Sequence, residues 1–290
     1  MLKRVPSILL VALLGYALAA PAQTPDIAAE PAVHVFASPG GTDLKAYVFA
    51  PKDQARGSGR PSIVIFHGGG WAEGEPSWAF ARARHFAERG LVAVAAQYRL
   101  SDGKTITLLD AMADARAIIR WMRTQSAALG LDPSRIAADG WSAGAHLAAS
   151  AAIFDDQPAV ASRPSGAPNA LVLVSPAVAL ESDSWAQQLL GSKANIRDVS
   201  PDAHVRKGLP PTIILQGQQD SVTPLSGVKR FCDRMMAAGN VCELHVYDGF
   251  GHLFTPAGIP DNGQPKPDPA TRADALAKAE RFLKSLGYIR

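Results

Sequence analysis

The chain of 290 residues is 47% hydrophobic and 19% charged, a balance typical of a globular protein that buries one large core or two smaller ones. Its formal net charge is +3, which falls to +1 if a leader carrying Lys3 and Arg4 is removed, and no cationic run is present. We therefore expect neither nucleic acid nor an anionic membrane surface as a partner.

Residues 1–22 have the pattern of a secretory signal peptide. Two basic residues stand near the start, the apolar run Ile8–Leu18 is short for a bilayer span, and the small residues that follow fit the A-x-A cleavage rule. We place the cut after Ala22, because a cut after Ala20 would put Pro21 beside the scissile bond. The alternative is an uncleaved anchor, which the short apolar run disfavours. The pattern predicts export to the periplasm or the cell exterior, without stable membrane insertion.

Strand and helix patterns alternate along the rest of the chain. Residues 31–51 read as two strands joined in a hairpin by a turn at 39–41, and a polar loop follows at 52–60. The further strands expected are Ser62–Phe66, Leu91–Ala96, Arg135–Ala138, Ala170–Val174, Thr212–Leu215 and Val241–Tyr247. The expected helices are Ser77–Arg89, Leu108–Ala127, Ala145–Ile153, Leu225–Ala238 and Ala270–Leu286. This alternation predicts a single α/β domain over residues 23–290, with a mostly parallel sheet covered by helices on both faces.

Residues 176–210 interrupt this alternation. The segment combines a stretch of helical character at 181–190 with a polar continuation, and it follows the carboxyl end of a predicted strand. Insertions at this end of a parallel sheet usually shape the binding pocket. We expect either a small helical insertion over the site or a long surface loop.

The sequence G-W-S-A-G at residues 140–144 lies between a predicted strand and a predicted helix. A glycine two residues to each side of Ser142 allows a sharp turn in which the strand and the helix approach closely. Such a turn holds the serine in a strained backbone conformation at a helix N-terminus, where negative charge is favoured. The pattern predicts that Ser142 is a nucleophile.

The sequence H-G-G-G-W at residues 67–71 follows an apolar strand directly. Glycines allow the backbone to turn sharply and to present consecutive N–H groups to a ligand. Together with the N–H of Ala143, those of Gly69 and Gly70 are predicted to bind the oxyanion that forms when Ser142 attacks a carbonyl. The alternative is a glycine-rich turn beside a structural histidine.

Ser142 needs a general base, because a hydroxyl is a poor nucleophile near neutral pH. Among the seven histidines, His252 is the best candidate, since it lies in a glycine-bearing loop after the last strand. His245 lies within that strand and His146 projects from the helix one turn beyond Ser142, so we expect both to be structural.

A carboxylate must orient the imidazole and stabilise its cation. Asp220 follows the strand Thr212–Leu215 and is the predicted partner of His252. Asp248 is the rival, because it lies only four residues before His252. The order nucleophile, acid, histidine along the chain favours Asp220.

These motifs resemble those of α/β-hydrolases of the carboxylesterase type that carry the H-G-G-G oxyanion motif, as in hormone-sensitive-lipase-like and feruloyl- or acetylxylan-esterase-like groups. The resemblance runs from about Ser62 to Phe254 and includes Y-R-L at 98–100. The chain departs from it at Ala145, where many relatives have glycine, and in the N-terminal hairpin, where hormone-sensitive-lipase-like enzymes carry a helical cap. The resemblance implies the α/β-hydrolase fold and ester hydrolysis through an acyl-enzyme, without a metal or an organic cofactor.

The substrate is predicted only as a class, a small-molecule or polysaccharide-linked ester of a short acyl group. Trp71 and Trp141 either line the pocket or pack in the core. Export favours esters met outside the cytoplasm, such as acetyl or feruloyl groups on plant polysaccharide. The alternatives are an amidase or arylformamidase on the same scaffold and a non-catalytic binding protein, although no triad or oxyanion residue is missing. The sequence does not predict the oligomeric state.

The chain contains two cysteines, Cys232 and Cys242. The first lies late in a predicted helix and the second at the start of the next strand, with a glycine-containing helix stop between them. An oxidising compartment would preserve a disulfide between them, which we predict; two buried thiols are the alternative.

Overall fold

A computed structural model describes residues 30–51, 59–155 and 164–290. The predicted signal peptide, residues 1–22, lies outside the described residues. Within these described ranges, no helix combines the length and the apolar character that crossing a membrane requires.

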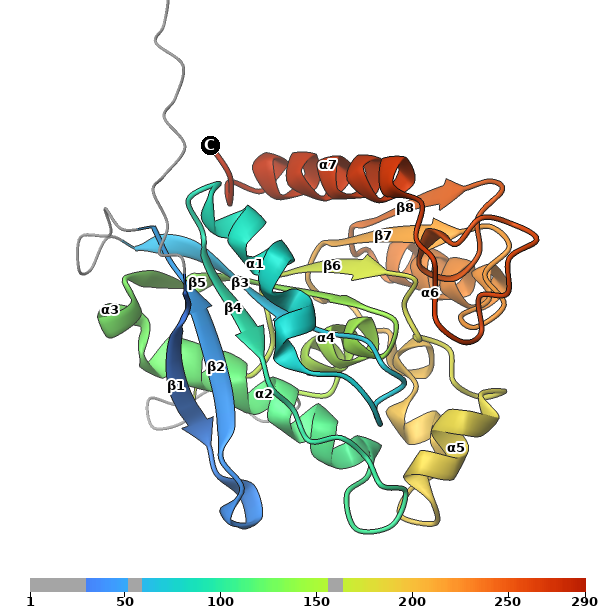
Figure 1. Ribbon diagram of the computed structural model, residues 1–290, viewed down its shortest axis with the longest axis horizontal. Coiled ribbons are helices and arrows are strands. Elements are labelled where there is room, and N and C mark those ends of the chain that lie inside the picture. Colours follow the sequence, from blue (N-terminus) through green and yellow to red (C-terminus); the bar gives the residue numbers. More distant parts are fainter. Residues whose placement is uncertain (1–29, 52–58, 156–163) are drawn as a thin grey trace, which may run out of the picture.

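The described part of the chain forms one sheet of eight strands in the order β1-β2-β4-β3-β5-β6-β7-β8 (Figure 1). β2 pairs antiparallel with both β1 and β4, and all other neighbours are parallel. The strands are β1 (Ala32–Ala37), β2 (Leu44–Phe49), β3 (Arg60–Phe66), β4 (Val92–Ala96), β5 (Leu131–Trp141), β6 (Ala170–Val174), β7 (Thr212–Gly217) and β8 (Cys242–Tyr247). The predicted hairpin and the mostly parallel sheet are confirmed.

Helices cover both faces of the sheet, as the alternation of strands and helices predicts (Figure 1). They are α1 (Phe80–Ala87), α2 (Leu108–Thr124), α3 (Ser126–Leu129), α4 (Ala143–Ile153), α5 (Ser184–Leu190), α6 (Leu225–Ala237) and α7 (Pro269–Ser285). The apolar core is accordingly divided in two: α2, α4 and α6 pack on one face, and α1 and α7 on the other.

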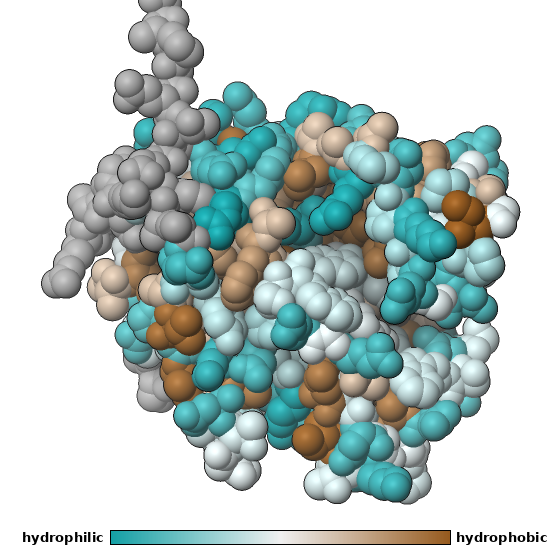
Figure 2. Space-filling model, viewed as in Figure 1, coloured by the Kyte–Doolittle hydropathy of each residue, from teal (hydrophilic) through white to brown (hydrophobic). Residues whose placement is uncertain are grey.

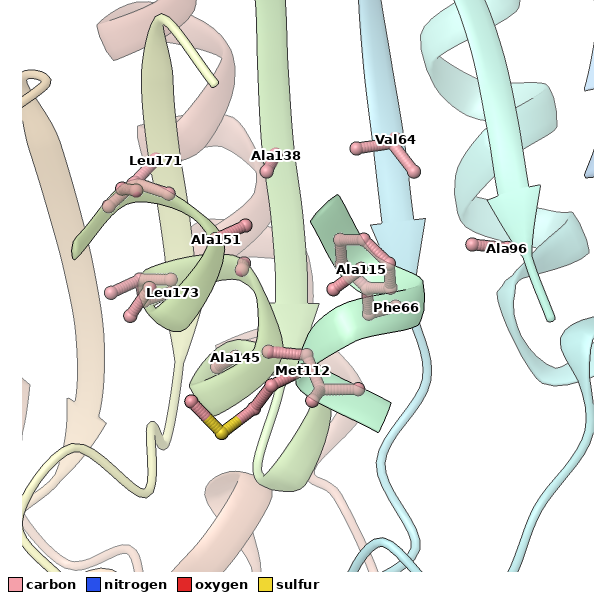
Figure 3. Close-up of a cluster of buried hydrophobic side chains, with 14 of the residues drawn as sticks. Val64, Phe66, Ala96, Met112, Ala115, Ala138, Ala145, Ala151, Leu171 and Leu173 are labelled. Atoms are coloured by element: carbon pink, nitrogen blue, oxygen red, sulfur yellow. The ribbon is translucent and has the colours of Figure 1, made fainter. Parts of the chain in front are cut away.

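The continuous apolar sequence of β3 explains how one strand serves both halves of the core. Successive side chains of a strand point to opposite faces, so Val64 and Phe66 pack with α2 and α4, whereas Ile63 and Ile65 pack with α1 and α7. Figure 3 shows Phe66 beside Ala115 of α2, and Ala145 of α4 belongs to the same buried cluster. Every residue of α4 is buried, which fixes the start of this helix firmly against the sheet.

Two predicted helices differ in detail from the observed ones. The segment expected as a helix from Ser77 begins with a 3-10 turn at Pro76–Ala79, and α1 follows it. The long helix expected to run to Ala127 ends after Thr124, and the short α3 follows.

Residues 176–210 form an insertion that contains α5 and two 3-10 turns, Ile196–Val199 and Pro201–His204. The side chain of Asp183 caps α5 by accepting a hydrogen bond from the N–H of Ala186 at 2.9 Å. Of the two forms expected for this segment, the structure therefore shows the helical insertion.

A disulfide joins Cys232, on α6, to Cys242, at the start of β8. The two Cα atoms lie 5.6 Å apart, well within the range for a disulfide, and the bridge closes a short loop between the helix and the edge strand. The pairing is the one expected from the sequence.

We predict that Gly144→Ala destabilises the fold. A Cβ atom at this position would lie 2.1 Å from the carbonyl oxygen of Phe66 and 2.4 Å from that of His67, both of them backbone atoms at the end of β3. Relief requires α4 and β3 to separate, so the free energy of unfolding should fall by about 3 kcal/mol or more. Denaturant unfolding measures it.

Gly263→Ala is the matched control, because a Cβ atom there meets nothing within 4 Å. We expect a change within about 0.5 kcal/mol for this surface position. Equal stability of Gly144→Ala and the parent protein would contradict the close packing described for the strand–helix junction.

Candidate active site

Ser142 occupies a sharp turn between β5 and α4. Its backbone has φ 55° and ψ −122°, a conformation that is strained for any residue except glycine. A Cβ atom at Gly140 would lie 2.4 Å from the backbone of Gly144, so the turn requires glycine at both places. The turn leaves Ser142 partly exposed at the N-terminus of α4, as the G-x-S-x-G pattern predicts.

The structure brings Ser142, His252 and Asp220 together from three separate loops. The Oγ atom of Ser142 lies 3.0 Å from Nε2 of His252, and Nδ1 of His252 lies 3.0 Å from Oδ2 of Asp220. Because a carboxylate only accepts, the proton of the neutral imidazole is on Nδ1, and Nε2 is then free to accept the proton of the serine hydroxyl. This is the arrangement of a Ser-His-Asp triad.

Asp220 is held by a dense set of donors. Its Oδ1 atom accepts from the N–H groups of Val222, at 3.0 Å, and Thr223, at 2.7 Å, and its Oδ2 atom accepts from the Thr223 hydroxyl at 2.9 Å and from Nε2 of Gln216 at 3.1 Å. These hydrogen bonds orient the carboxylate toward His252 and stabilise its negative charge.

The rival residues are engaged elsewhere. His146 is fully buried between Trp71 and the carbonyl of Val199, and burial lowers its pKa to about 4, so it stays neutral and structural as expected. Asp248 is exposed and accepts a hydrogen bond from Gln219 at 3.0 Å, so it is not the partner of His252.

The segment 67–71 packs against Trp141, the residue before Ser142, since a Cβ atom at Gly68 would lie 2.7 Å from its side chain. Gly69 and Gly70 have left-handed conformations, at φ 115° and 56°. Within the described part of the chain, neither of their N–H groups donates a hydrogen bond. Ala143 is the first residue of α4, so its N–H has no acceptor within the helix. Three backbone donors therefore remain available near Ser142, as an oxyanion site requires.

Of the two interpretations of Trp71, the structure supports packing in the core and not the substrate pocket. The side chain is only 2% exposed, and its indole N–H donates to Nδ1 of His146 at 3.1 Å within the core. The structure places another tryptophan nearby instead: Nε1 of Trp185, on α5, donates to the carbonyl of Gly70 at 2.9 Å. The insertion thus contacts the glycine-rich segment directly.

Two cavities lie beside the triad. The small cavity, of about 240 Å³, is lined by Trp141 and Leu253, the chain neighbours of Ser142 and His252, and by Trp78, Val174 and Phe254 among others. The large cavity, of about 500 Å³, is lined by residues of the segments 176–185 and 221–230. Trp141 therefore lines a cavity, which is one of the two positions that the sequence analysis considered for it.

Three residues that support the site were not predicted from the sequence. Gln216 and Thr223 bind Asp220, and the D-x-x-T spacing from Asp220 to Thr223 is a signal that can be read, since such spacings favour side-chain-to-backbone turns. Asp261 binds the N–H of His252 from nine residues further along the same loop, and no local pattern in the sequence indicates this contact.

The described residues contain no cluster of histidine, cysteine, aspartate or glutamate suited to a metal ion. The chemistry proposed below uses the side chains and backbone N–H groups of this site.

The sheet order and the triad at the carboxyl ends of the strands define an α/β-hydrolase. More particularly, the chain belongs to the BD-FAE family, whose model matches residues 48–235.

The chain is also similar to named esterases. It is 26% identical over 219 residues to esterase LipQ of Mycobacterium tuberculosis (strain ATCC 25618 / H37Rv), covering 69% of this chain and 52% of that protein. It is 27% identical over 224 residues to the isoprenylcysteine alpha-carbonyl methylesterase ICME of Arabidopsis thaliana, covering 67% of this chain and 50% of that protein. The chain thus spans about half the length of these curated relatives.

Solved structures of Thermogutta terrifontis esterase 2 resemble the whole domain. The apo form is 35% identical, with a TM-score of 0.79, and the match covers 90% of this chain and 97% of that one. The form with bound propionate is 34% identical, with a TM-score of 0.78 over 90% of this chain and 96% of that one.

We predict that Asp220→Asn lowers kcat by about ten-thousandfold, because an amide facing Nδ1 favours the wrong tautomer of His252. Asp248→Asn is the matched control and should leave kcat unchanged, since this side chain is exposed and bound to Gln219. Steady-state kinetics with a short p-nitrophenyl ester measures both. A large loss in Asp248→Asn with a small one in Asp220→Asn would reverse the assignment of the acid.

Proposed function

We propose that the protein is a serine carboxylesterase that works through an acyl-enzyme. The observation that carries this proposal is the continuous line from Asp220 through His252 to Ser142, with both contacts at 3.0 Å, beside the donors of Gly69, Gly70 and Ala143. Hydroxyl, base, acid and oxyanion site together are the machinery of acyl transfer.

The reaction follows from these positions. Oγ of Ser142 attacks the ester carbonyl carbon while its proton passes to Nε2 of His252, and the carbonyl oxygen becomes an anion held by the backbone N–H groups. Collapse of this intermediate breaks the bond to the alcohol, which leaves with the proton from Nε2. Water then attacks the acyl-enzyme, giving its proton to His252, and the acid product departs as Ser142 regains a proton. Asp220 stabilises the imidazolium in both halves.

The relatives support this chemistry. LipQ and ICME are named as an esterase and a methylesterase, and Thermogutta terrifontis esterase 2 is described as phosphorylated by paraoxon. That esterase also has structures with bound propionate and butyrate, which are the carboxylate products expected from short acyl groups. By this likeness we infer that a short acyl ester is the substrate here.

The two cavities suit the two parts of such an ester. The small cavity is walled mainly by apolar and aromatic side chains, including Trp78 and Trp141, together with Arg82 and Arg272, and its size fits a short acyl or single-ring acid. The large cavity carries Glu181, Asp183 and Arg230, polar groups suited to an alcohol rich in hydroxyls. This supports acetyl or feruloyl esters of plant polysaccharide as candidates.

One face of the molecule bears on where the apolar part of the substrate binds. On the face shown in Figure 2, hydrophilic side chains predominate and hydrophobic ones are scattered between them. A large apolar patch, as expected where a protein binds a lipid surface, is not seen on this face. We infer from the apolar lining of the small cavity that the apolar part of the substrate binds there.

We predict that Ser142→Ala lowers kcat by at least about a thousandfold on every ester substrate, because the triad acts as a unit. With this variant as the blank, the wild type should hydrolyse p-nitrophenyl acetate, propionate and butyrate faster than octanoate and dodecanoate. Acetylated xylan and methyl ferulate test the natural candidates. Wild-type-like turnover by Ser142→Ala would remove the assignment, and absence of acetate and ferulate release would remove only the polysaccharide esters.

We also propose that the protein is exported, on the basis of the leader pattern in residues 1–22 and of the disulfide between Cys232 and Cys242, which an oxidising compartment preserves. N-terminal sequencing of protein made in its native host should give a chain that starts at Gln23. An intact Met1 on the mature protein would contradict the proposal.

A further inference from the structure

Asp261 is a buried carboxylate in an exposed loop. Its exposed fraction is 8%, while residues 257–260 and 262–264 on either side are exposed. A charged side chain is turned inward at such a place only where partners compensate for its lost hydration. The partners of Asp261 are therefore informative.

Within the described residues, the side chain of Asp261 accepts hydrogen bonds from the loops that carry the acid and the base. Oδ2 accepts from the N–H of His252 at 2.7 Å and from the N–H of Ser221 at 3.1 Å, and Oδ1 accepts from the Ser221 hydroxyl. Ser221 is the residue after Asp220. One carboxylate therefore ties the backbone of the base to the backbone beside the acid.

The residue before His252 is also suited to this contact. A Cβ atom at Gly251 would lie 2.3 Å from Oδ2 of Asp261, so any larger residue before His252 would push the carboxylate away. Burial raises the pKa of Asp261, but hydrogen bonds from the Ser221 side chain and from the His252 and Ser221 N–H groups lower it by more. The net pKa lies below the ordinary value, and the group is an anion at neutral pH.

The turn that follows His252 needs such a restraint. Leu253 and Phe254 have φ of 51° and 65°, left-handed conformations that cost energy in residues with a side chain. The turn is held at consecutive N–H groups: Asp261 binds that of His252, and Oγ of Ser175 binds that of Leu253 at 3.1 Å. Without the first of these bonds, the strained backbone has freedom to relax and to carry the imidazole away from Ser142.

We propose that Asp261 is a positioning residue that fixes His252 relative to Asp220, and so keeps Nε2 of the imidazole in line with the hydroxyl of Ser142. The proposal rests on the esterase function proposed above and deepens it. Asp261 does not touch the reacting atoms; it acts through the backbone of the base and of the acid loop.

The test compares three variants with the wild type. Asp261→Ala removes all three hydrogen bonds, and kcat should fall by about a hundredfold with KM within about twofold, because misplacement of a catalytic group affects the chemical step more than binding. Asp261→Asn keeps an acceptor for both N–H groups and a partner for the Ser221 hydroxyl, so it should recover kcat to within about fivefold of the wild type. Asn262→Ala, at an exposed neighbouring position, should match the wild type.

Two results would overturn the proposal. One is a wild-type kcat in Asp261→Ala, and the other is an equal loss in Asp261→Ala and Asp261→Asn, which would show that the hydrogen-bonding geometry is not what matters. If Asp261→Ala does not fold, Ser221→Ala decides, since Ser221 is exposed and loses only one bond. A several-fold loss of kcat supports the proposal, and an unchanged kcat overturns it.

A second readout separates this proposal from the esterase function itself. Amide hydrogen exchange at Ser221 and His252, measured by mass spectrometry of overlapping peptides, should be faster in Asp261→Ala than in the wild type, whatever the activity. A wild type that hydrolyses no ester would refute the function, while unchanged amide exchange in Asp261→Ala would refute the tie between the two loops.

Discussion

The structure depends on the backbone of one residue, Ser142, which is held in a strained conformation where β5 meets α4. The turn is tight because Gly140 and Gly144 approach each other and the end of β3 so closely that no side chain fits between them. The strain is offset by the burial of α4, every residue of which is inside the protein. The core of this fold therefore does more than stabilise the chain: it holds the nucleophile at a helix N-terminus in a position it would not adopt by itself.

The remaining parts of the site reach Ser142 because parallel strands end at the same edge of the sheet. The loop after β3 supplies the glycines of the oxyanion site, the loop after β7 supplies Asp220, and the loop after β8 supplies His252. Side chains hold each of these loops: Trp185, on α5, binds the glycine segment, and Thr223 binds Asp220 within the same loop. Asp261 binds the N–H of His252 within the loop after β8 and joins this loop to Ser221 in the loop after β7. The scaffold brings the loops together, and these contacts fix their positions.

The elements of the fold and the two main motifs could be predicted because their signals are local. Apolar runs such as the one in β3 and the glycine spacing around Ser142 are visible within a few residues. The sequence could not place Trp71, because a tryptophan suits both a pocket wall and a core. Only its hydrogen bond to His146 in the folded protein shows that it belongs to the core. Asp261 could not be found either, since its partners Ser221 and His252 become neighbours only in the folded chain. Long-range contacts of loops carry no periodic signal.

The measurement that tests this account most directly is the identification of the acyl-enzyme. The protein is mixed rapidly with p-nitrophenyl acetate, quenched in acid during turnover and digested, and the acetylated peptide is mapped by mass spectrometry. The account predicts an acetyl group on Ser142 that appears within the first turnover and disappears when the substrate is exhausted. Two results would contradict it. One is sustained hydrolysis with the acetyl group on another residue. The other is sustained hydrolysis with no acetylated residue, although the alcohol is released before the acid.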